Sequence, residues 1–158
     1  MIKEGEKLPS VKLHENNPKE LVDISLLFSG KKGIIFGVPG AFTPGCSKTH
    51  LPGYVTDFDK FKSKGIALIA CVSVNDAFVM NAWGEANKAS GKVKMLADPK
   101  AEFTRAIGLE VDLTEALGSV RSKRYSMLIN DGKVEKLFIE PDGTGLTCSL
   151  SSNILNAL

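Results

Sequence analysis

The residue types and spacing best suited to chemistry occur together in Gly37-Val38-Pro39-Gly40-Ala41-Phe42-Thr43-Pro44-Gly45-Cys46. Thr43-Pro44 has the form of a helix start, with a hydroxyl residue at the N-cap and proline at the first helical position. Cys46 then falls in the first turn, where unpaired backbone N–H groups and the helix dipole favour a thiolate over a thiol. Because a thiolate is a nucleophile, this run predicts thiol chemistry at Cys46.

His50 follows Cys46 by four residues, so both side chains lie on the same face of the expected helix. A Cys–His pair on one face is one way to build a cysteine hydrolase. That chemistry also uses a third group to orient the histidine, and no Asp or Asn is identifiable for this role from the sequence. The hydrolase is therefore the weaker interpretation of this pair.

The cysteine count bears on the other thiol classes. The three cysteines, at positions 46, 71 and 148, are odd in number and widely spaced, unlike the disulfide framework of a small secreted domain. The absence of a C-x-x-C pair argues against a disulfide oxidoreductase. Two histidines are too few for a convincing zinc site, so we expect no metal.

Size and composition are those of an ordinary soluble globular protein. The 158 residues fit one domain, with 43% apolar and 24% charged residues. A formal charge of +2 indicates neither a nucleic-acid nor a membrane partner. The N-terminus has no signal or transit pattern, which predicts a cytoplasmic protein, or a mitochondrial one if a transit peptide is missing from this sequence.

Apolar runs alternate with helix-like segments, which is typical of an α/β domain. The expected strands are Gly33–Val38, Ile66–Val74, Met95–Ala97, Arg124–Asn130 and Lys133–Glu140. Asp131-Gly132 predicts a tight hairpin between the last two strands.

Four helices are expected between and after these strands. The first spans Thr43–Lys64 with a kink at Pro52, and the last spans Ser151–Leu158. Asn75-Asp76 caps the second, and Asp98-Pro99 starts a third that stops at Gly108. The expected apolar face of the second helix consists of Phe78, Val79, Ala82, Trp83 and Ala86.

The pattern P-x-x-x-T-x-x-C, formed by Pro39, Thr43 and Cys46, resembles the active-site loop of the peroxiredoxins. The whole run is most similar to the peroxiredoxin-5, or type II, branch. The resemblance continues in Ser47-Lys48-Thr49-His50-Leu51-Pro52-Gly53, Ser73-Val74-Asn75-Asp76, Leu96-Ala97-Asp98-Pro99 and Pro141-Asp142-Gly143-Thr144-Gly145-Leu146-Thr147-Cys148. It implies an α/β thioredoxin-like fold, a central mixed β-sheet flanked by helices, in a single domain over residues 1–158.

The resemblance also assigns roles at the reacting centre. Cys46 matches the peroxidatic cysteine, which attacks the peroxide and becomes a sulfenic acid. Thr43 matches the hydroxyl that orients thiolate and peroxide, Pro39 shields the pocket from water, and Arg124 matches the distal arginine. A guanidinium suits this place because it stays charged and offers a fork of donors to a developing anion.

Further positions have supporting or pocket roles. Gly45 contributes a backbone N–H, and His50 matches a pocket neighbour rather than a proton shuttle. Phe42, Leu113 and Leu117 are the expected substrate-pocket residues. The segment 109–119 is closer to plant than to animal relatives, which carry an aromatic residue there, so the preference among alkyl peroxides stays open.

Two cysteines are candidates for resolving the sulfenic acid. Cys148, in a glycine-flanked loop before the last helix, matches the resolving cysteine of animal-type relatives, which form the disulfide within one chain. Cys71 stands in an expected strand, where plant type II relatives carry their second cysteine. A disulfide needs Cα atoms within about 7 Å. Because a glycine-rich loop opens more readily than a central strand, we favour Cys148.

The predicted function is a thiol peroxidase without metal or organic cofactor. The resemblance implies hydrogen peroxide, alkyl hydroperoxides and peroxynitrite as substrates, thioredoxin as reductant, and a weak homodimer. The alternatives are a one-cysteine or Cys46–Cys71 mechanism that uses glutaredoxin or glutathione, and a redox-sensing interaction protein.

Overall fold

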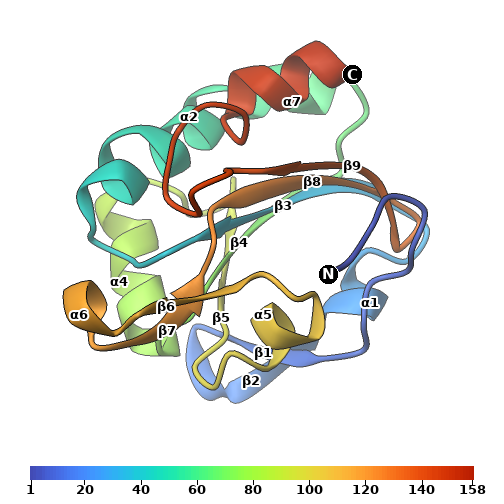
Figure 1. Cartoon of the computed structure of the whole chain (residues 1–158). Coiled ribbons are helices and arrows are strands. Elements are labelled where there is room, and N and C mark those ends of the chain that lie inside the picture. The colour runs from blue at the N-terminus through green and yellow to red at the C-terminus, as the bar shows by residue number, and fades with distance from the viewer.

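A seven-stranded mixed sheet forms the centre of the structure, a computed structural model that describes residues 1–158 (Figure 1). The strands are β1 (Lys12–Glu15), β2 (Asn17–Asp23), β3 (Lys32–Val38), β4 (Leu68–Ser73), β5 (Lys94–Ala97), β8 (Tyr125–Asn130) and β9 (Lys133–Ile139), in the order β2-β1-β5-β4-β3-β8-β9. Strands β3, β4 and β5 are parallel, and β1, β2, β8 and β9 join them in antiparallel pairs. A separate hairpin pairs β6 (Glu110–Leu113) with β7 (Ser119–Ser122).

Helices cover both faces of this sheet. They are α1 (Ile24–Leu27), the π-helical turn η1 (Cys46–His50), α2 (Leu51–Thr56), α3 (Phe58–Ser63), α4 (Ala77–Ala86), α5 (Glu102–Ala106), α6 (Thr114–Leu117) and α7 (Ser151–Ala157). Helices α2, α3, α4 and α7 pack against one face, and α1 and α5 against the other. None of the helices combines the length and the apolar character needed to cross a lipid bilayer.

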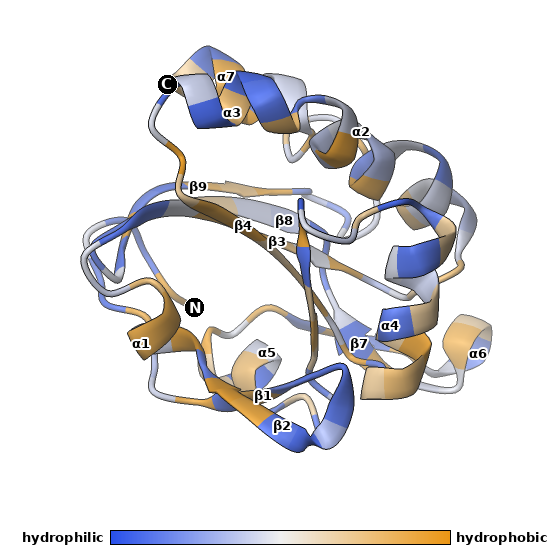
Figure 2. Ribbon diagram, turned by 180° about the vertical axis from the view of Figure 1, so that it is seen from behind, coloured by the Kyte–Doolittle hydropathy of each residue, from blue (hydrophilic) through white to orange (hydrophobic).

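The two faces correspond to two apolar clusters that share the central strands. Ile34, Phe36 and Val38 of β3 join the cluster under α2, α3, α4 and α7, while Ile35 joins the opposite one. Strand β3 is apolar throughout its buried part because both of its faces are covered, as parallel strands usually are. Figure 2 shows this apolar character along β3 and β4. The predicted α/β architecture is confirmed.

The predicted strands are confirmed within two residues at either end. The hairpin between β8 and β9 turns at Asp131 and Gly132, whose φ angles of 50° and 75° are those of a tight hairpin turn. The predicted element list is incomplete, however. It lacks the β1–β2 and β6–β7 pairs and the short helices α1 and α6.

The helix predicted over Thr43–Lys64 is irregular next to Pro52 and again at Asp57. Pro52 is the second residue of α2, directly after the π turn, and the break between α2 and α3 falls at Asp57. Proline cannot donate to the carbonyl four residues earlier, and the wider π turn before it accommodates this loss.

Two other details differ from prediction. Helix α5 begins at Glu102 rather than directly after Asp98-Pro99, because the Asp98 carboxylate reaches forward to the N–H groups of Phe103 and Thr104. Its predicted stop at Gly108 is confirmed, with φ +71° there. On α4, Asp76 caps the helix as predicted, but the predicted apolar face is wrong, because Phe78, Ala82 and Ala86 are exposed. The buried residues of α4 are Ala77, Met80, Trp83 and Gly84.

Candidate active site

Cys46 lies at the junction between β3 and the helical segment that starts at Pro44, and it is fully buried. The helix start is where the sequence predicts it, but the Thr43 side chain does not cap it. The Thr43 Oγ1–H instead donates to the Gly40 carbonyl oxygen at 2.7 Å. The loop turns through Phe42 at φ +62°, which brings Thr43 back toward Gly40 and leaves Cys46 in the first turn.

The turn that follows Cys46 is π-helical. The backbone N–H of Leu51 donates to the Cys46 carbonyl oxygen, a bond that spans five residues instead of four. His50, in the same turn, is also fully buried, and its ring packs 4.9 Å from that of Phe36, between ring centroids. Thiol and imidazole thus lie in one buried layer above the sheet.

Arg124 brings a buried positive charge to the sulfur. Its Nη2 donates to Cys46 Sγ at 3.4 Å, its Nη1 to His50 Nδ1 at 3.1 Å and its Nε to the Thr144 carbonyl oxygen at 3.3 Å. The side chain is only 3% exposed, and none of the three ion pairs in the structure involves it. The guanidinium therefore has no carboxylate as its immediate counter-charge.

His50 connects this guanidinium to the C-terminal segment. Since Arg124 can only donate, His50 Nδ1 is the acceptor, and Nε2–H donates to the Ser149 carbonyl oxygen at 3.0 Å. Burial and the neighbouring Arg124 lower the pKa of His50 to about 3. A neutral imidazole that bridges two groups is a positioning element. Its arrangement does not fit the base of a cysteine hydrolase.

The Ser149 carbonyl oxygen is the meeting point of three donors. Besides His50, it accepts from the Tyr54 hydroxyl at 3.0 Å and from the Ser126 hydroxyl. These donors come from η1, α2 and β8, which are remote from Ser149 in sequence. The residue next to Cys148 is therefore fixed to the same framework that holds Cys46 and Arg124.

The other two cysteines lie in different surroundings, and all three are free. Cys148 is half-buried, and its Sγ–H donates to the Ile139 carbonyl oxygen at 3.3 Å. Burial and the nearby Glu140 carboxylate raise the pKa of the Cys148 thiol. Cys71 is fully buried in β4 opposite Phe36, and burial raises the pKa of its thiol well above the ordinary range.

Two side chains that the sequence analysis did not assign hold the active-site loop. The Asn75 carboxamide oxygen accepts from the Ala41 N–H at 3.0 Å, which gives a physical role to the Ser73-Val74-Asn75-Asp76 motif. Arg121 donates to the Pro39 carbonyl oxygen at 3.4 Å and to that of Leu117 at 3.1 Å. No local signal distinguishes Arg121, because the carbonyl groups that it holds belong to other segments.

The three expected pocket residues are placed differently from one another. Leu117 lies beside the loop, since a Cβ added at Gly40 would meet its Cδ1 at 3.5 Å. Leu113 is half-buried at the end of β6. Phe42 projects outward and is 57% exposed. Leu146 lies beside Gly45, since a Cβ added at Gly45 would meet its Cδ1 at 3.6 Å.

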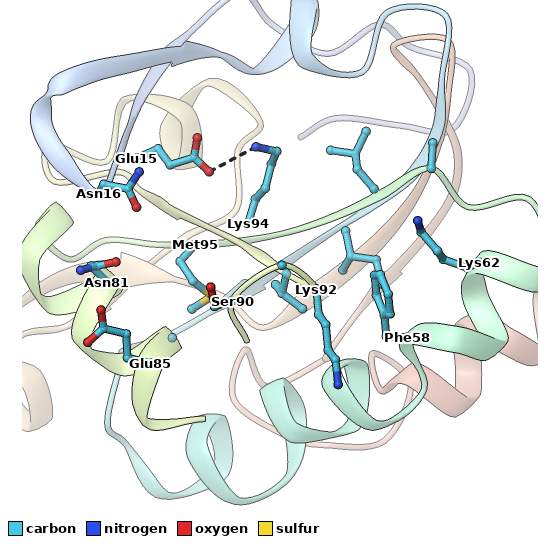
Figure 3. A pocket seen from close by; sticks show the side chains of 16 residues that line it. Glu15, Asn16, Phe58, Lys62, Asn81, Glu85, Ser90, Lys92, Lys94 and Met95 are labelled. Atoms are coloured by element: carbon cyan, nitrogen blue, oxygen red, sulfur yellow. Dashed lines mark hydrogen bonds and ion pairs between the residues drawn. The ribbon is translucent and has the colours of Figure 1, made fainter. Parts of the chain in front are cut away.

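A cavity of about 360 Å³ lies elsewhere, between α3, α4 and β5 (Figure 3). Its polar lining includes Lys62, Lys92 and the Glu15–Lys94 ion pair, and its apolar lining includes Phe58 and Met95. None of the predicted site residues contributes to it. No group of three or more His, Cys, Asp or Glu side chains is clustered to hold a metal ion.

A mixed sheet that presents a cysteine at a strand-to-helix junction, beside a buried arginine, defines a thioredoxin-like thiol oxidoreductase. Residues 3–158 match the family model described as Redoxin. Peroxiredoxin-2E, chloroplastic, of Arabidopsis thaliana is 45% identical over 164 residues, which cover 99% of this chain and 69% of that protein. Peroxiredoxin-2D of the same plant is 44% identical over 144 residues, covering 91% and 88%.

Solved structures agree with these relatives. Reduced Prx3 of Vibrio vulnificus, in complex with H2O2, superposes with a TM-score of 0.92 at 48% identity and 99% coverage of both chains. Peroxiredoxin 5 of Alvinella pompejana gives a TM-score of 0.85 at 48% identity, covering 94% of this chain and 96% of that one. The chain belongs to the Redoxin family and is a peroxiredoxin of the peroxiredoxin-5 type, an oxidoreductase with thiol peroxidase activity.

Proposed function

We propose that this peroxiredoxin reduces hydrogen peroxide, alkyl hydroperoxides and peroxynitrite with Cys46 as the nucleophile. The observation that carries the proposal is the buried Arg124, which lacks a carboxylate partner and donates to Cys46 Sγ. A buried cation without a counter-charge is costly. A Cys46 thiolate supplies that counter-charge, and the two groups stabilise each other.

In the first step the Cys46 sulfur attacks one peroxide oxygen and the O–O bond breaks. The sulfur becomes a sulfenic acid. The other oxygen leaves as hydroxide or alkoxide, which takes up a proton, or as part of nitrite when peroxynitrite is the substrate. A guanidinium has five N–H donors, of which three are used by Cys46, His50 and Thr144. The other two are available to the leaving oxygen as negative charge develops on it.

Thr43 and Pro39 complete this step in the proposal. The Thr43 hydroxyl gives its hydrogen to Gly40, so its oxygen is left to accept the O–H of the bound peroxide. Backbone N–H groups of the first helical turn at Gly45 and Cys46 have no intrahelical acceptor and supply further donors. The side chains of Pro39 and Leu117 are assigned the role of keeping water from the sulfur. Arg121 fixes the two residues relative to each other, because it donates to both of their carbonyl oxygens.

In the second step the Cys148 sulfur attacks the Cys46 sulfenic acid, the S–O bond breaks and water leaves as the disulfide forms. This pairing is favoured because the residue after Cys148, Ser149, is hydrogen-bonded to His50, which follows Cys46 in the same helical turn. Cys71 is enclosed in β4 between β3 and β5, so it has no comparable route. Thioredoxin then restores both thiols by disulfide exchange.

The test is a coupled assay in which NADPH consumption with peroxide is measured in the presence of thioredoxin or of glutaredoxin and glutathione. We expect turnover with thioredoxin that is lost in Cys46→Ser and in Cys148→Ser. Turnover with glutaredoxin alone, retained in Cys148→Ser, would favour the one-cysteine mechanism. A single stoichiometric oxidation without turnover would favour the redox-sensing role.

A weak homodimer is also part of the proposal. The exposed rings of Phe42 and Phe78 belong to neighbouring segments, because Ala41 is hydrogen-bonded to Asn75 just before α4. Sedimentation velocity should show a concentration-dependent dimer that is weakened in Phe78→Glu. A monomer at all concentrations would contradict the proposed dimer.

The cytoplasmic location stays a prediction.

A further inference from the structure

Glu140, the residue after β9, gathers five hydrogen bonds from three consecutive residues of the Cys148 segment. Its Oε1 accepts from the N–H and Oγ1–H of Thr147, at 2.8 and 2.6 Å. Its Oε2 accepts from the N–H of Cys148 at 2.9 Å and from the N–H and Oγ–H of Ser149, at 2.9 and 2.6 Å. Glu140 is fully buried, and all five donors to its carboxylate come from this segment.

The carboxylate is held as an anion by these donors alone. No ion pair includes Glu140. Burial opposes its ionisation, but hydrogen bonds from Ser149 and Thr147 outweigh burial and bring the pKa of Glu140 to about 2. An ionised carboxylate is acceptor-only, and bonds to it are about twice as strong as neutral ones.

The same segment is held from its other side. The Ser149 carbonyl oxygen accepts from His50, Tyr54 and Ser126, and the Cys148 thiol donates to Ile139. The preceding turn is tied more loosely, by the exposed Asp142 to the N–H groups of Thr144 and Gly145. Movement of the Cys148 backbone away from Ile139 breaks the bond from its N–H group to Glu140.

We propose that Glu140 is a positioning residue that latches the Cys148 segment closed and sets how often the Cys148 thiol becomes accessible. The latch concerns the opening of the segment. Its consequence for catalysis, the rate of disulfide formation, rests on the proposed function. No hydrogen bond or ion pair joins the Glu140 carboxylate to the side chains of Cys46 or Arg124, and its partners are Thr147, Cys148 and Ser149.

The test measures alkylation of Cys148 and Cys71 in the Cys46→Ser protein, with each thiol quantified by mass spectrometry. Glu140→Gln keeps the size of the side chain but replaces one acceptor oxygen by an NH2 donor. It should accelerate Cys148 alkylation about tenfold, the equivalent of losing roughly one net hydrogen bond. Cys71, buried in the central sheet, should react no faster. Thr147→Val removes a single donor and should give a smaller acceleration.

Glu135→Gln is the matched control, because Glu135 stands on the same strand β9 but pairs with Lys32 at the surface. It should leave Cys148 alkylation unchanged. Equal acceleration of Cys148 and Cys71 in Glu140→Gln would indicate general loosening of the fold and overturn the latch. An unchanged Cys148 rate would overturn it as well.

Disulfide formation in the protein with all three cysteines separates this proposal from the proposed function. If both stand, Glu140→Gln forms the Cys46–Cys148 disulfide several-fold faster after oxidation. If Cys148 alkylation accelerates but neither protein forms that disulfide, the latch stands and the proposed resolving step fails. If the disulfide forms at the same rate in both proteins, the latch does not control resolution and the proposal fails in its catalytic part.

Discussion

Arg124 Nη2 lies 3.4 Å from Cys46 Sγ, although the two residues are 78 positions apart. The sheet register explains this contact. Strand β8 begins directly after Arg124 and pairs with β3, Tyr125 opposite Gly37, and β3 leads directly into the loop that carries Cys46. The antiparallel β3–β8 pair thus brings the cation and the thiol to the same end of the sheet.

Arg124→Gln should lower the second-order rate constant for reaction with hydrogen peroxide by about 10²–10³, because it removes a charged donor from the developing oxyanion. Trp83, the single tryptophan, donates to the Ser47 hydroxyl at 2.9 Å, so its fluorescence should report oxidation of Cys46 in a stopped-flow experiment. Arg105→Lys, on the exposed side of α5, is the control and should react as the wild type does. A loss of less than threefold in Arg124→Gln would contradict the role given to the guanidinium.

His50 should make the fold sensitive to mild acid. Its folded pKa of about 3 lies below the ordinary value of 6.5, so between these values the unfolded chain binds a proton that the folded one does not. Stability therefore rises with pH in this window and falls by about 2 kcal/mol from pH 7 to pH 5. The folded and ordinary pKa values of Glu140, about 2 and 4.5, place its own effect below pH 5.

Urea unfolding of wild type, His50→Gln and His14→Gln at pH 7 and pH 5 isolates this effect. His50→Gln should lose about 2 kcal/mol less stability than the wild type over that interval. His14→Gln, which changes the other histidine, should follow the wild type. An identical loss in His50→Gln and wild type would show that His50 does not titrate as described.

Cys71→Ala should leave the peroxidase cycle intact. The thiol is fully buried and its pKa is well above the ordinary range, so little thiolate is available for exchange. We expect turnover with thioredoxin within twofold of wild type and a loss of about 1 kcal/mol in the free energy of unfolding for the atom removed from the core. Loss of turnover in a folded Cys71→Ala protein would instead favour the plant-like Cys46–Cys71 mechanism.

Tyr125→Phe should stabilise the protein. The Tyr125 side chain is fully buried, and its hydroxyl is the one buried side-chain polar group without a hydrogen-bond partner. Such a group costs about 1–3 kcal/mol. We expect the melting temperature in calorimetry to rise by roughly 2–4 °C for each kcal/mol of this cost. Tyr54→Phe is the contrast, because the Tyr54 hydroxyl donates to the Ser149 carbonyl oxygen, and its removal should lower the melting temperature.

The sequence predicts those parts of the fold that local patterns encode. Asp131-Gly132 predicts its hairpin because both residues accept the positive φ that the turn requires. The β1–β2 pair has no such signal, since β2 carries polar side chains that stay largely exposed at the edge of the sheet. The position of Cys46 follows from local helix signals, whereas Arg124 is recognisable only through the family resemblance.

Tertiary contacts explain what the sequence analysis did not find. Glu140 stands at the end of a predicted strand, and nothing nearby in the sequence indicates that its carboxylate faces inward to three residues of a later loop. Arg121 and Asn75 likewise act on backbone groups of the Cys46 loop from other strands and turns. Their roles depend on sheet register, which only the folded chain defines.

The most direct test of the account is a non-reducing peptide map of the fully reduced protein after one equivalent of hydrogen peroxide. We predict a Cys46–Cys148 disulfide within a monomer and a free Cys71. A Cys46–Cys71 disulfide, or a lasting Cys46 sulfenic acid with Cys148 free, would contradict the account.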